Sequence, residues 1–111
     1  DLEKEIAVEQ VKQMMDDKYV FKLVDVREPS EYGICNIEGA TLIPLGDIEA
    51  KDTALLNGMS LDDEIVLHCK AGVRSMKALK ALEDMGFRNL KSMRGGINEW
   101  SEKIDSSVPL Y

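Results

Sequence analysis

A nearly continuous apolar run, Ile-Val-Leu-His at residues 65–68, is the feature that most restricts the fold of this chain. A strand that is apolar at almost every position needs cover on both faces, as the central strands of parallel sheets have. The run leads directly into Cys69. After a short loop, an amphipathic helix is predicted by the spacing of Val73, Met76, Leu79, Leu82 and Met85. Gly86 is expected to end this helix, so the segment is typical of an α/β fold.

Extended and helical patterns alternate along the rest of the chain. The other predicted strands are residues 6–7, 21–26, 41–43 and 90–93. Further helices are predicted to contain Val8, Val11, Met14 and Met15, to cover residues 45–56 irregularly, and to contain Ile97, Trp100 and Ile104. Residues 28–33, Glu-Pro-Ser-Glu-Tyr-Gly, are turn-rich and are expected to leave the sheet, and residues 106–111 form a tail. This order predicts a five-stranded parallel sheet, helices on both faces, and a site beyond the carboxyl ends of the strands.

The composition favours one globular domain over the whole of residues 1–111. Hydrophobic residues make up 44% and charged residues 32%, and no repeat, low-complexity segment or linker divides the chain. No apolar run approaches the roughly 20 residues of a membrane span, and the start, Asp-Leu-Glu-Lys-Glu, is acidic where signal peptides are basic. The net charge of −7 argues against nucleic-acid binding. We therefore expect a cytoplasmic protein with neither membrane nor nucleic acid as a partner.

Cys69 stands where a thiol gains reactivity. It follows a buried strand and precedes a helix by a short loop, so unpaired backbone N–H groups and the positive end of the helix dipole are expected near its sulfur. Gly72 allows the loop to turn several amides inward as a nest for an anion, and Lys70 and Arg74 add positive charge. These features favour the thiolate and make Cys69 the candidate nucleophile. The alternative is a small buried hydrophobe at a strand end.

The loop and one strand end supply the other candidate site residues. The loop residues expected to bind an anionic substrate are Lys70, Ala71, Gly72, Val73, Arg74 and Ser75. Ser75 could equally cap the helix that follows. Asp25 and Arg27 are two residues apart at a strand end and therefore share a face, where they can form an ion pair. The alternative for this pair is a solvated, charged strand end.

Three further residues have structural interpretations. His68 is the only histidine, and as the neighbour of Cys69 in a strand it points to the opposite face, so we expect it to be structural. It has too few partners for a zinc site, and we expect no metal. Cys35 is expected to be a quietly buried thiol, and the alternative is a resolving thiol or a regulatory disulfide with Cys69. Trp100 is expected to anchor the core.

Three motifs, taken in sequence order, resemble the rhodanese family of sulfurtransferases. They are Leu-Val-Asp-Val-Arg-Glu-Pro at residues 23–29, the loop from Cys69 to Arg74, and Arg-Gly-Gly at residues 94–96 with Trp100. The resemblance covers nearly the whole chain and implies the rhodanese fold. It also implies a ping-pong mechanism in which Cys69 takes the sulfane sulfur of a donor, carries it as a persulfide and yields it to an acceptor nucleophile. The family resemblance implies no metal or organic cofactor, and it suggests that Asp25 and Arg27 fix the loops around the site.

A narrower resemblance concerns residues 31–40 and the carboxyl-terminal residues 104–111. Both are similar to the C-terminal rhodanese domain of two-domain adenylyltransferase and sulfurtransferase proteins. This likeness implies an adenylyltransferase domain ahead of the present one in the parent chain, and a small ubiquitin-like sulfur carrier protein whose adenylated C-terminus accepts the sulfur. The sulfur donor would be thiosulfate or a cysteine desulfurase persulfide, and the sulfur would serve molybdenum cofactor biosynthesis, thiamine biosynthesis or tRNA thiolation.

Two details bear on the narrower resemblance. The chain begins at Asp1 rather than Met, which agrees with a domain excised from a longer protein. Many rhodaneses have Gly-His-Ile where this chain has Cys35-Asn36-Ile37, so one possible polar contact near the site is lost. The histidine of that motif does not carry sulfur, and the implied chemistry is unaffected.

Three alternative functions are open on the sequence. Phosphatases related to rhodaneses have Cys, five residues and then Arg, whereas Arg74 follows Cys69 after only four residues, and the shorter ring suits one sulfur better than a tetrahedral phosphate. The second alternative is a free-standing thiosulfate sulfurtransferase in sulfide metabolism or detoxification. The third is an interaction domain without activity, against which the intact Cys69, Gly72 and Arg74 argue.

Overall fold

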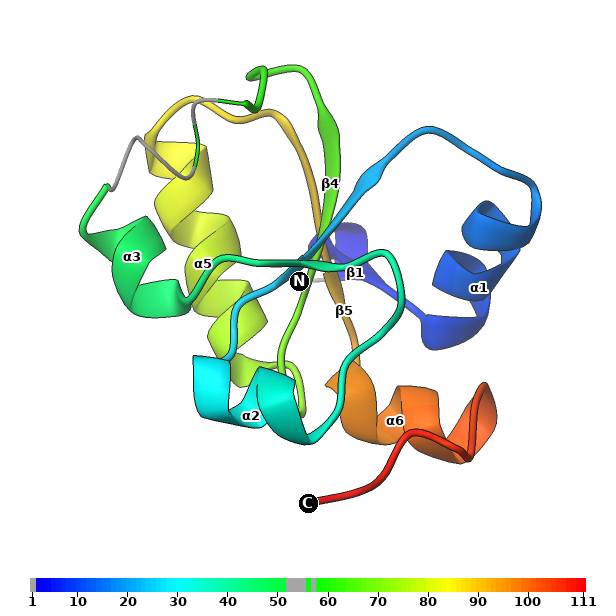
Figure 1. Cartoon of the computed structure of the whole chain (residues 1–111). Helices are drawn as coiled ribbons and strands as arrows, with labels where there is room; N and C mark the ends of the chain where they lie inside the picture. The colour runs from blue at the N-terminus through cyan, green and yellow to red at the C-terminus, as the bar shows by residue number, and fades with distance from the viewer. Residues whose placement is uncertain (1, 52–55, 57) are drawn as a thin grey trace.

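The computed structural model describes residues 2–51, 56 and 58–111 of the chain (Figure 1). The strands are β1 (Glu5–Ile6), β2 (Lys22–Asp25), β3 (Thr41–Leu42), β4 (Glu64–His68) and β5 (Asn89–Met93). The helices among these residues are α1 (Val8–Asp16), α2 (Pro29–Ile34), α3 (Leu45–Glu49), α5 (Val73–Asp84) and α6 (Gly96–Lys103), after a 3-10 turn at Leu2–Lys4. Every predicted strand is present, and its ends differ from the prediction by at most one residue.

The strands form one parallel sheet in the order β1-β5-β4-β2-β3, so β4 lies at its centre. In the register of the sheet, Asp25 of β2 lies beside His68 of β4, and Ser92 of β5 lies beside Leu67. Both neighbouring strands therefore bring polar residues close to Cys69, which directly follows β4. The predicted α/β fold with a five-stranded parallel sheet is confirmed.

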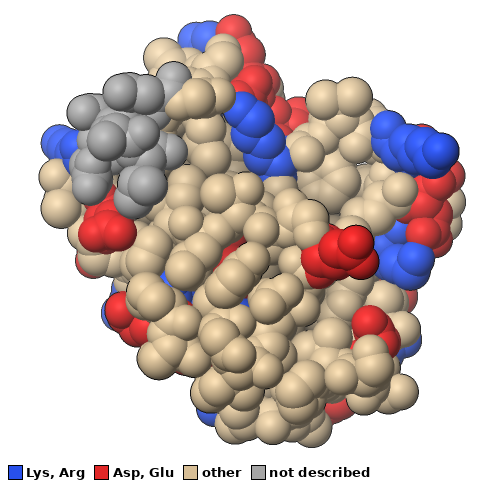
Figure 2. Space-filling view, viewed as in Figure 1, with Lys and Arg blue, Asp and Glu red and all other residues tan. Residues whose placement is uncertain are grey.

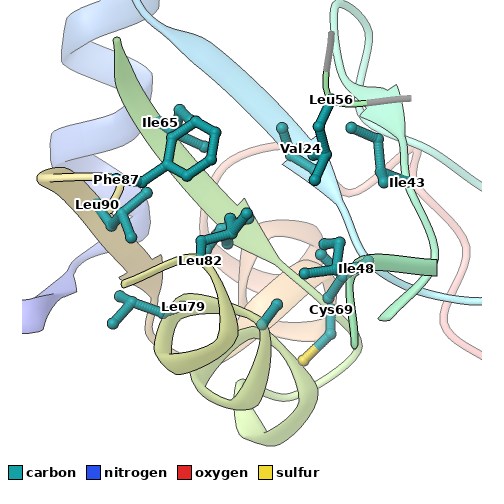
Figure 3. Close-up of a cluster of buried hydrophobic side chains, with 13 residues drawn as sticks. Val24, Ile43, Ile48, Leu56, Ile65, Cys69, Leu79, Leu82, Phe87 and Leu90 are labelled. Atoms are coloured by element: carbon teal, nitrogen blue, oxygen red, sulfur yellow. The ribbon is translucent and has the colours of Figure 1, made fainter. Parts of the chain in front are cut away.

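Two apolar clusters lie on opposite faces of the sheet, because successive side chains of a strand point in opposite directions. On one face, Ile65 and Leu67 of β4 belong to the same cluster as Leu79 and Leu82 of α5, and Cys69 lies at its edge (Figure 3). The cluster on the other face contains Val8, Val11, Leu23, Val66, Met93, Ile97 and Trp100. Helices α3 and α5 cover the first face, and α1 and α6 cover the second (Figure 1). As expected, Trp100 is buried in the core.

Residues 28–33 leave the sheet as expected, but they lead into a helix, α2, rather than a run of turns. Pro29 occupies the first helical position, where its missing N–H costs nothing. The Glu31 carboxylate accepts the backbone N–H of Glu28 at 3.1 Å, which caps the start of the helix. None of the helical residues is buried. The sequence therefore shows no apolar periodicity over this short segment, and its turn-forming residues conceal the helix.

The helix predicted over residues 45–56 is shorter than expected. It ends at Glu49, with Ala50 as its cap. Lys51 follows with a φ of 57°, and this left-handed backbone conformation turns the chain out of the helical path. Residues 52–55, which the prediction included, lie outside the described residues.

The tail at residues 106–111 is packed against the domain. The Ser101 hydroxyl of α6 donates to the Val108 carbonyl at 2.5 Å, and the Val108 side chain is buried. At the end of the tail, the Tyr111 hydroxyl donates to the Glu31 carboxylate of α2 at 2.6 Å. These contacts bring the end of the tail to the edge of the sheet where the strands end and Cys69 lies.

The surface of the domain is charged mainly at its edges on the face shown in Figure 2. Lysine, arginine and acidic side chains lie around the rim of this face, and its middle is largely uncharged. Among residues 2–51, 56 and 58–111, no helix is long and apolar enough to cross a membrane.

The core on the α5 face predicts a large loss of stability when Leu79 is shortened. Leu79 is fully buried, so Leu79→Ala leaves a cavity and should lower the free energy of unfolding by about 2–5 kcal/mol. Val20 is 92% exposed, and Val20→Ala should change it by no more than about 0.5 kcal/mol. Urea unfolding measures both variants. Equal effects would contradict the packing described here.

Candidate active site

Cys69 lies between β4 and α5, and backbone N–H groups face its sulfur. The N–H of Gly72 donates to Cys69 Sγ at 3.1 Å, and the N–H of Ser75 donates at 3.3 Å. Gly72 is the N-cap of α5 and has no side chain that could bond the open amides of the first turn. The sulfur takes the place of the usual capping oxygen. The two amides and the helix dipole therefore favour negative charge on Sγ.

The sulfur of Cys69 is also enclosed. Cys69 is only 1% exposed and belongs to the apolar cluster on one sheet face. Figure 3 shows its Sγ directed toward α5. Gly72 has a φ of 109°, which residues with a Cβ rarely adopt, and this conformation lets its N–H turn back to the sulfur. Cys69 is buried, and backbone amides bond its sulfur, so its role as a nucleophile stays a prediction.

The start of α6 holds the carbonyl side of the loop. The N–H of Ile97 donates to the Cys69 carbonyl at 2.9 Å, and the N–H of Asn98 donates to the Lys70 carbonyl at 3.1 Å. Gly96 makes this approach possible, since a Cβ on Gly96 would lie 2.5 Å from the Cys69 carbonyl oxygen. The carbonyl groups of the loop therefore point toward α6 and away from the sulfur. The N–H groups on the opposite side of the loop face Sγ.

Two buried hydroxyl groups also adjoin the sulfur. Ser75 Oγ lies 3.5 Å from Cys69 Sγ and donates to the Gly72 carbonyl at 3.2 Å. Its other neighbour is Ser92 Oγ of β5, at 2.7 Å. The side chain of Ser75 does not cap α5, which was one of the two roles considered for it. The sequence analysis missed Ser92, because an isolated serine in a strand carries no motif.

Arg74 points to a carboxylate of α2. Its Nη1 and Nη2 donate to the two oxygens of Glu31, at 2.5 and 2.9 Å. The hydrogen bonds from Arg74 lower the pKa of Glu31 to about 2. The same pairing raises the pKa of Arg74, so the guanidinium stays charged. The loop cation expected to bind an anion thus has a carboxylate partner in the structure, and Glu31 had not been singled out.

Tyr111, also missed by the sequence analysis, joins several of these groups. Its hydroxyl donates to Glu31 at 2.6 Å and accepts from Arg27 Nη1 at 2.9 Å. The ammonium of Lys70 lies 4.6 Å from the centre of the Tyr111 ring, within range of a cation–π contact. Burial, together with the bond to Glu31, raises the pKa of Tyr111, so the phenol keeps its proton at neutral pH. A residue far along the chain therefore lies beside the first loop residue.

Asp25 and Arg27 form the expected ion pair, and the alternative of a solvated strand end is wrong. Arg27 Nη2 lies 2.6 Å from Asp25 Oδ2, and both side chains are fully buried. Arg27 also donates to the Cys35 carbonyl at 2.7 Å. Burial acts to lower the pKa of Arg27, but the hydrogen bonds with Asp25 and Tyr111 outweigh burial and raise the pKa. The pair ties β2 to the segment after α2 and to the tail.

His68 is buried on the side of Asp25. Its Nε2 lies 3.7 Å from Asp25 Oδ2, and neither ring nitrogen has a hydrogen-bond partner among the described residues. Burial lowers the pKa of His68 to about 4, against the attraction of Asp25, so the ring is neutral at pH 7. No contact with Cys69 Sγ is present within the described part of the chain. This placement agrees with a structural histidine.

The remaining candidates lie at the rim of the site. Ala71 is exposed, and Val73 is 67% exposed at the start of α5. Cys35 and Cys69 are both free thiols, and Cys35 Sγ lies 3.8 Å from Arg27 Nη1. No cluster of metal-ligating side chains occurs among the described residues. The arrangement can hold a charged sulfur on Cys69 between amides and hydroxyls, with cations close by.

The low pKa of Glu31 predicts a loss of stability in acid. The group is depressed in the folded state, so its contribution is complete above about pH 4.5 and disappears as the pH falls toward 2. Glu31→Gln should therefore lower the free energy of unfolding by about 1–2 kcal/mol at pH 7 and by little near pH 2. Urea unfolding of both proteins across this range measures the difference. A difference that does not depend on pH would contradict the pairing.

The close approach of Gly96 predicts that a methyl group there disturbs Cys69. Gly96→Ala would force the carbonyl of Cys69 to move and would place a Cβ at a φ of 60°. We expect alkylation of Cys69 by iodoacetamide at neutral pH to become slower, because the amides lose their alignment with Sγ and stabilise its negative charge less. Gly46→Ala is the matched control, since its Cβ would meet nothing within 4 Å. An unchanged rate of alkylation in Gly96→Ala would refute this role for α6.

Comparison with known proteins agrees with this geometry. Probable adenylyltransferase/sulfurtransferase MoeZ of Mycobacterium tuberculosis is 34% identical over 106 residues, which are 96% of this chain and 26% of MoeZ. Adenylyltransferase and sulfurtransferase MOCS3-2 of Zea mays is 31% identical over 109 residues, which are 96% of this chain and 23% of that protein. The chain thus spans about a quarter of the length of these curated relatives.

A solved structure and a family model agree with the similarity to these relatives. The human single-domain sulfurtransferase TSTD1 superposes with a TM-score of 0.79 at 25% identity, over 90% of this chain and 96% of that one. The family model described as "Rhodanese-like domain" matches residues 7–103. The expected relationship is confirmed, and this chain belongs to the rhodanese-like domain family.

Proposed function

We propose that the domain is a sulfurtransferase that carries sulfane sulfur as a persulfide on Cys69. The observation that carries the proposal is the pair of N–H groups, from Gly72 and Ser75, that donate to Cys69 Sγ at the start of α5. Such donors stabilise a thiolate, and they would also stabilise an anionic sulfur bound to it. Membership of the rhodanese-like family supports the same chemistry.

The loading step needs only a thiolate and a sulfane donor. Cys69 Sγ attacks the outer sulfur of thiosulfate, a new S–S bond forms, the S–S bond of thiosulfate breaks, and sulfite leaves with the electron pair. A cysteine desulfurase persulfide can replace thiosulfate, with a cysteine thiolate as the leaving group. Lys70 and Arg74 would attract either anionic donor, and for Arg74 the donor must compete with Glu31.

As acceptor we propose the adenylated C-terminus of a small ubiquitin-like sulfur carrier protein. The terminal sulfur of the persulfide attacks the acyl carbon and displaces AMP. A thiol then attacks Cys69 Sγ and forms a mixed disulfide with it, the S–S bond to the acyl group breaks, and the thiocarboxylate leaves with the electron pair. A second thiol reduces the mixed disulfide and restores Cys69. The names of MoeZ and MOCS3-2 join adenylyltransferase and sulfurtransferase activities, which supports this pairing with an adenylyltransferase domain in a longer parent chain. The same proposal includes the use of this sulfur in molybdenum cofactor biosynthesis, thiamine biosynthesis or tRNA thiolation.

Exposed apolar side chains support a protein acceptor. Ile34 at the end of α2, Val73 at the start of α5 and Leu110 in the tail are each more than half exposed. Each is close in sequence to a member of the hydrogen-bonded group of Glu31, Arg74 and Tyr111. Figure 2 shows a largely uncharged middle on the viewed face of the molecule. We place the reaction in the cytoplasm, where the Cys69 thiol would remain reduced.

A free-standing thiosulfate sulfurtransferase is the second candidate. The observation that favours it is the similarity to TSTD1, whose own chain is covered to 96% by this domain. The two candidates share the loading step and differ in the acceptor. Transfer to an adenylated carrier protein separates them, because a sulfurtransferase of sulfide metabolism would deliver sulfur only to small nucleophiles.

The first test is the detection of the persulfide itself. After incubation with thiosulfate, or with a cysteine desulfurase and cysteine, intact-protein mass spectrometry should show one added sulfur atom. The adduct should be absent in Cys69→Ala and present in Cys35→Ala, which is the matched control because Cys35 is also a buried free thiol. The absence of an adduct with both donors would refute the proposed function.

The second step of the experiment identifies the acceptor. The loaded domain is mixed with a sulfur carrier protein and the enzyme that adenylates it, in the presence of a thiol, and the carrier is weighed. A carrier heavier by the replacement of one oxygen with one sulfur supports the carrier proposal. Sulfur transfer to cyanide alone would favour the second candidate.

A further inference from the structure

A pair of buried hydroxyl groups adjoins the proposed nucleophile. Ser75 Oγ lies 3.5 Å from Cys69 Sγ and 2.7 Å from Ser92 Oγ. Ser75 is fully buried, and Ser92 is 1% exposed. Ser92 belongs to β5, whose pairing with β4 fixes its distance from the end of β4. Neither a sequence motif nor the chemistry proposed above assigns a role to Ser92.

The charge on the sulfur determines to which atoms the two hydroxyl groups donate their hydrogens. When Cys69 is a thiol, its S–H can donate to Ser75 Oγ, and the Ser75 proton is free to bond the Gly72 carbonyl. When Cys69 is a thiolate, the Ser75 proton turns to Sγ and Ser75 Oγ loses a donor. Either oxygen of the serine pair can be the donor, so Ser92 can supply the missing proton. In such a buried site each hydrogen bond strengthens the next.

We propose that Ser92 is a positioning residue for sulfur release, acting through Ser75. This inference rests on the proposed function and deepens it. When the acceptor is a small nucleophile such as cyanide, it attacks the terminal sulfur of the persulfide and forms a bond to it, whereas an adenylated carrier is itself attacked by that sulfur. With cyanide, the S–S bond breaks, and its electron pair moves to Cys69 Sγ, which leaves as a thiolate. The chain from Ser92 to Ser75 to Sγ stabilises the charge that appears at this moment.

Loading of sulfur onto Cys69 should not need the hydroxyl of Ser92. In loading, the thiolate is the nucleophile, and its charge is present before the step begins. A hydrogen bond to it stabilises the reactant, so removing that bond lowers the population of thiolate without slowing the thiolate that remains. At a pH well above the midpoint of alkylation, loading should therefore be as fast as in the wild type, or faster.

The test compares both half-reactions in single-turnover experiments on Ser92→Ala. Release of sulfur from the loaded domain to cyanide should be about 3- to 10-fold slower, as expected for one hydrogen bond. Loading from thiosulfate at high pH should not slow. The matched control is Ser101→Ala, which removes another buried hydroxyl, one that donates to the Val108 carbonyl. Release at the wild-type rate in Ser92→Ala, or equal slowing of both steps, would overturn the proposal.

Two further variants distinguish the effect of losing the Ser92 hydroxyl group from the effect of altered packing around residue 92. If Ser92 acts through Ser75, the double variant Ser75→Ala with Ser92→Ala should release sulfur no more slowly than Ser75→Ala alone. Ser92→Thr keeps a hydroxyl and should restore most of the release rate. Additive losses in the double variant, or a Ser92→Thr variant as slow as Ser92→Ala, would show that Ser92 is merely structural.

A measurement on the wild-type domain keeps the proposal testable if Ser92→Ala does not fold. The ¹³Cβ resonance of Ser92 should titrate with the same pH midpoint as alkylation of Cys69, and that of Ser101 should not. A flat Ser92 curve would overturn the proposal. This readout needs no sulfur donor, so a domain that never forms a persulfide would refute the proposed function while leaving the link between Ser92 and the sulfur measurable.

Discussion

The hydrogen bonds from the start of α6 to the loop after β4 are the constraint on which the site depends. A short loop cannot turn both its carbonyls and its N–H groups toward one atom. By bonding the carbonyls of Cys69 and Lys70, the N–H groups of Ile97 and Asn98 leave the opposite side of the loop to the sulfur. The arrangement requires glycine at position 96, where a Cβ would strike those carbonyls. Helix α6 therefore determines which way the carbonyl and N–H groups of the loop before α5 point. Both helices thus help to direct N–H groups at the sulfur.

The charged groups form a second layer that does not touch the sulfur through any hydrogen bond in the described residues. Asp25 and Arg27 are fully buried and pair with each other, which fixes the end of β2. Tyr111 connects Arg27 to Glu31, and Glu31 binds Arg74. A cation that is paired with a carboxylate attracts an incoming anion less strongly than an unpaired cation does, so a sulfur donor that binds Arg74, as we propose, would have to compete with Glu31. Backbone amides and the Ser75 hydroxyl thus adjoin the sulfur itself, and the charged side chains bond one another around it.

The elements that could be predicted are those that depend on patterns among residues close together in the sequence. The apolar run of β4, the helical spacing of α5 and the place of Cys69 between them follow from neighbouring residues, and the structure confirms each. The short polar helix α2 was missed because its residues are all at least partly exposed and show no periodicity. Glu31, Ser92 and Tyr111 reach the site from segments distant in the chain, and a single sequence holds no signal for such contacts. Resemblance to a family supplied the chemistry, and it did not supply these partners.

The two groups of donors around Cys69 suit two different sulfur atoms. In the thiolate, the amides of Gly72 and Ser75 and the Ser75 hydroxyl can all bond Sγ. Once a second sulfur is attached, the negative charge moves one bond outward, beyond the reach of a hydroxyl that lies 3.5 Å from Sγ and is tied to β5 through Ser92. The amide of Gly72 belongs to the loop, and the amide of Ser75 belongs to the first turn of α5. In the proposed cycle, the hydroxyl tied to the sheet would therefore favour charge on Sγ before loading and after release, and the amides at the start of α5 would stabilise charge on the terminal sulfur between these steps.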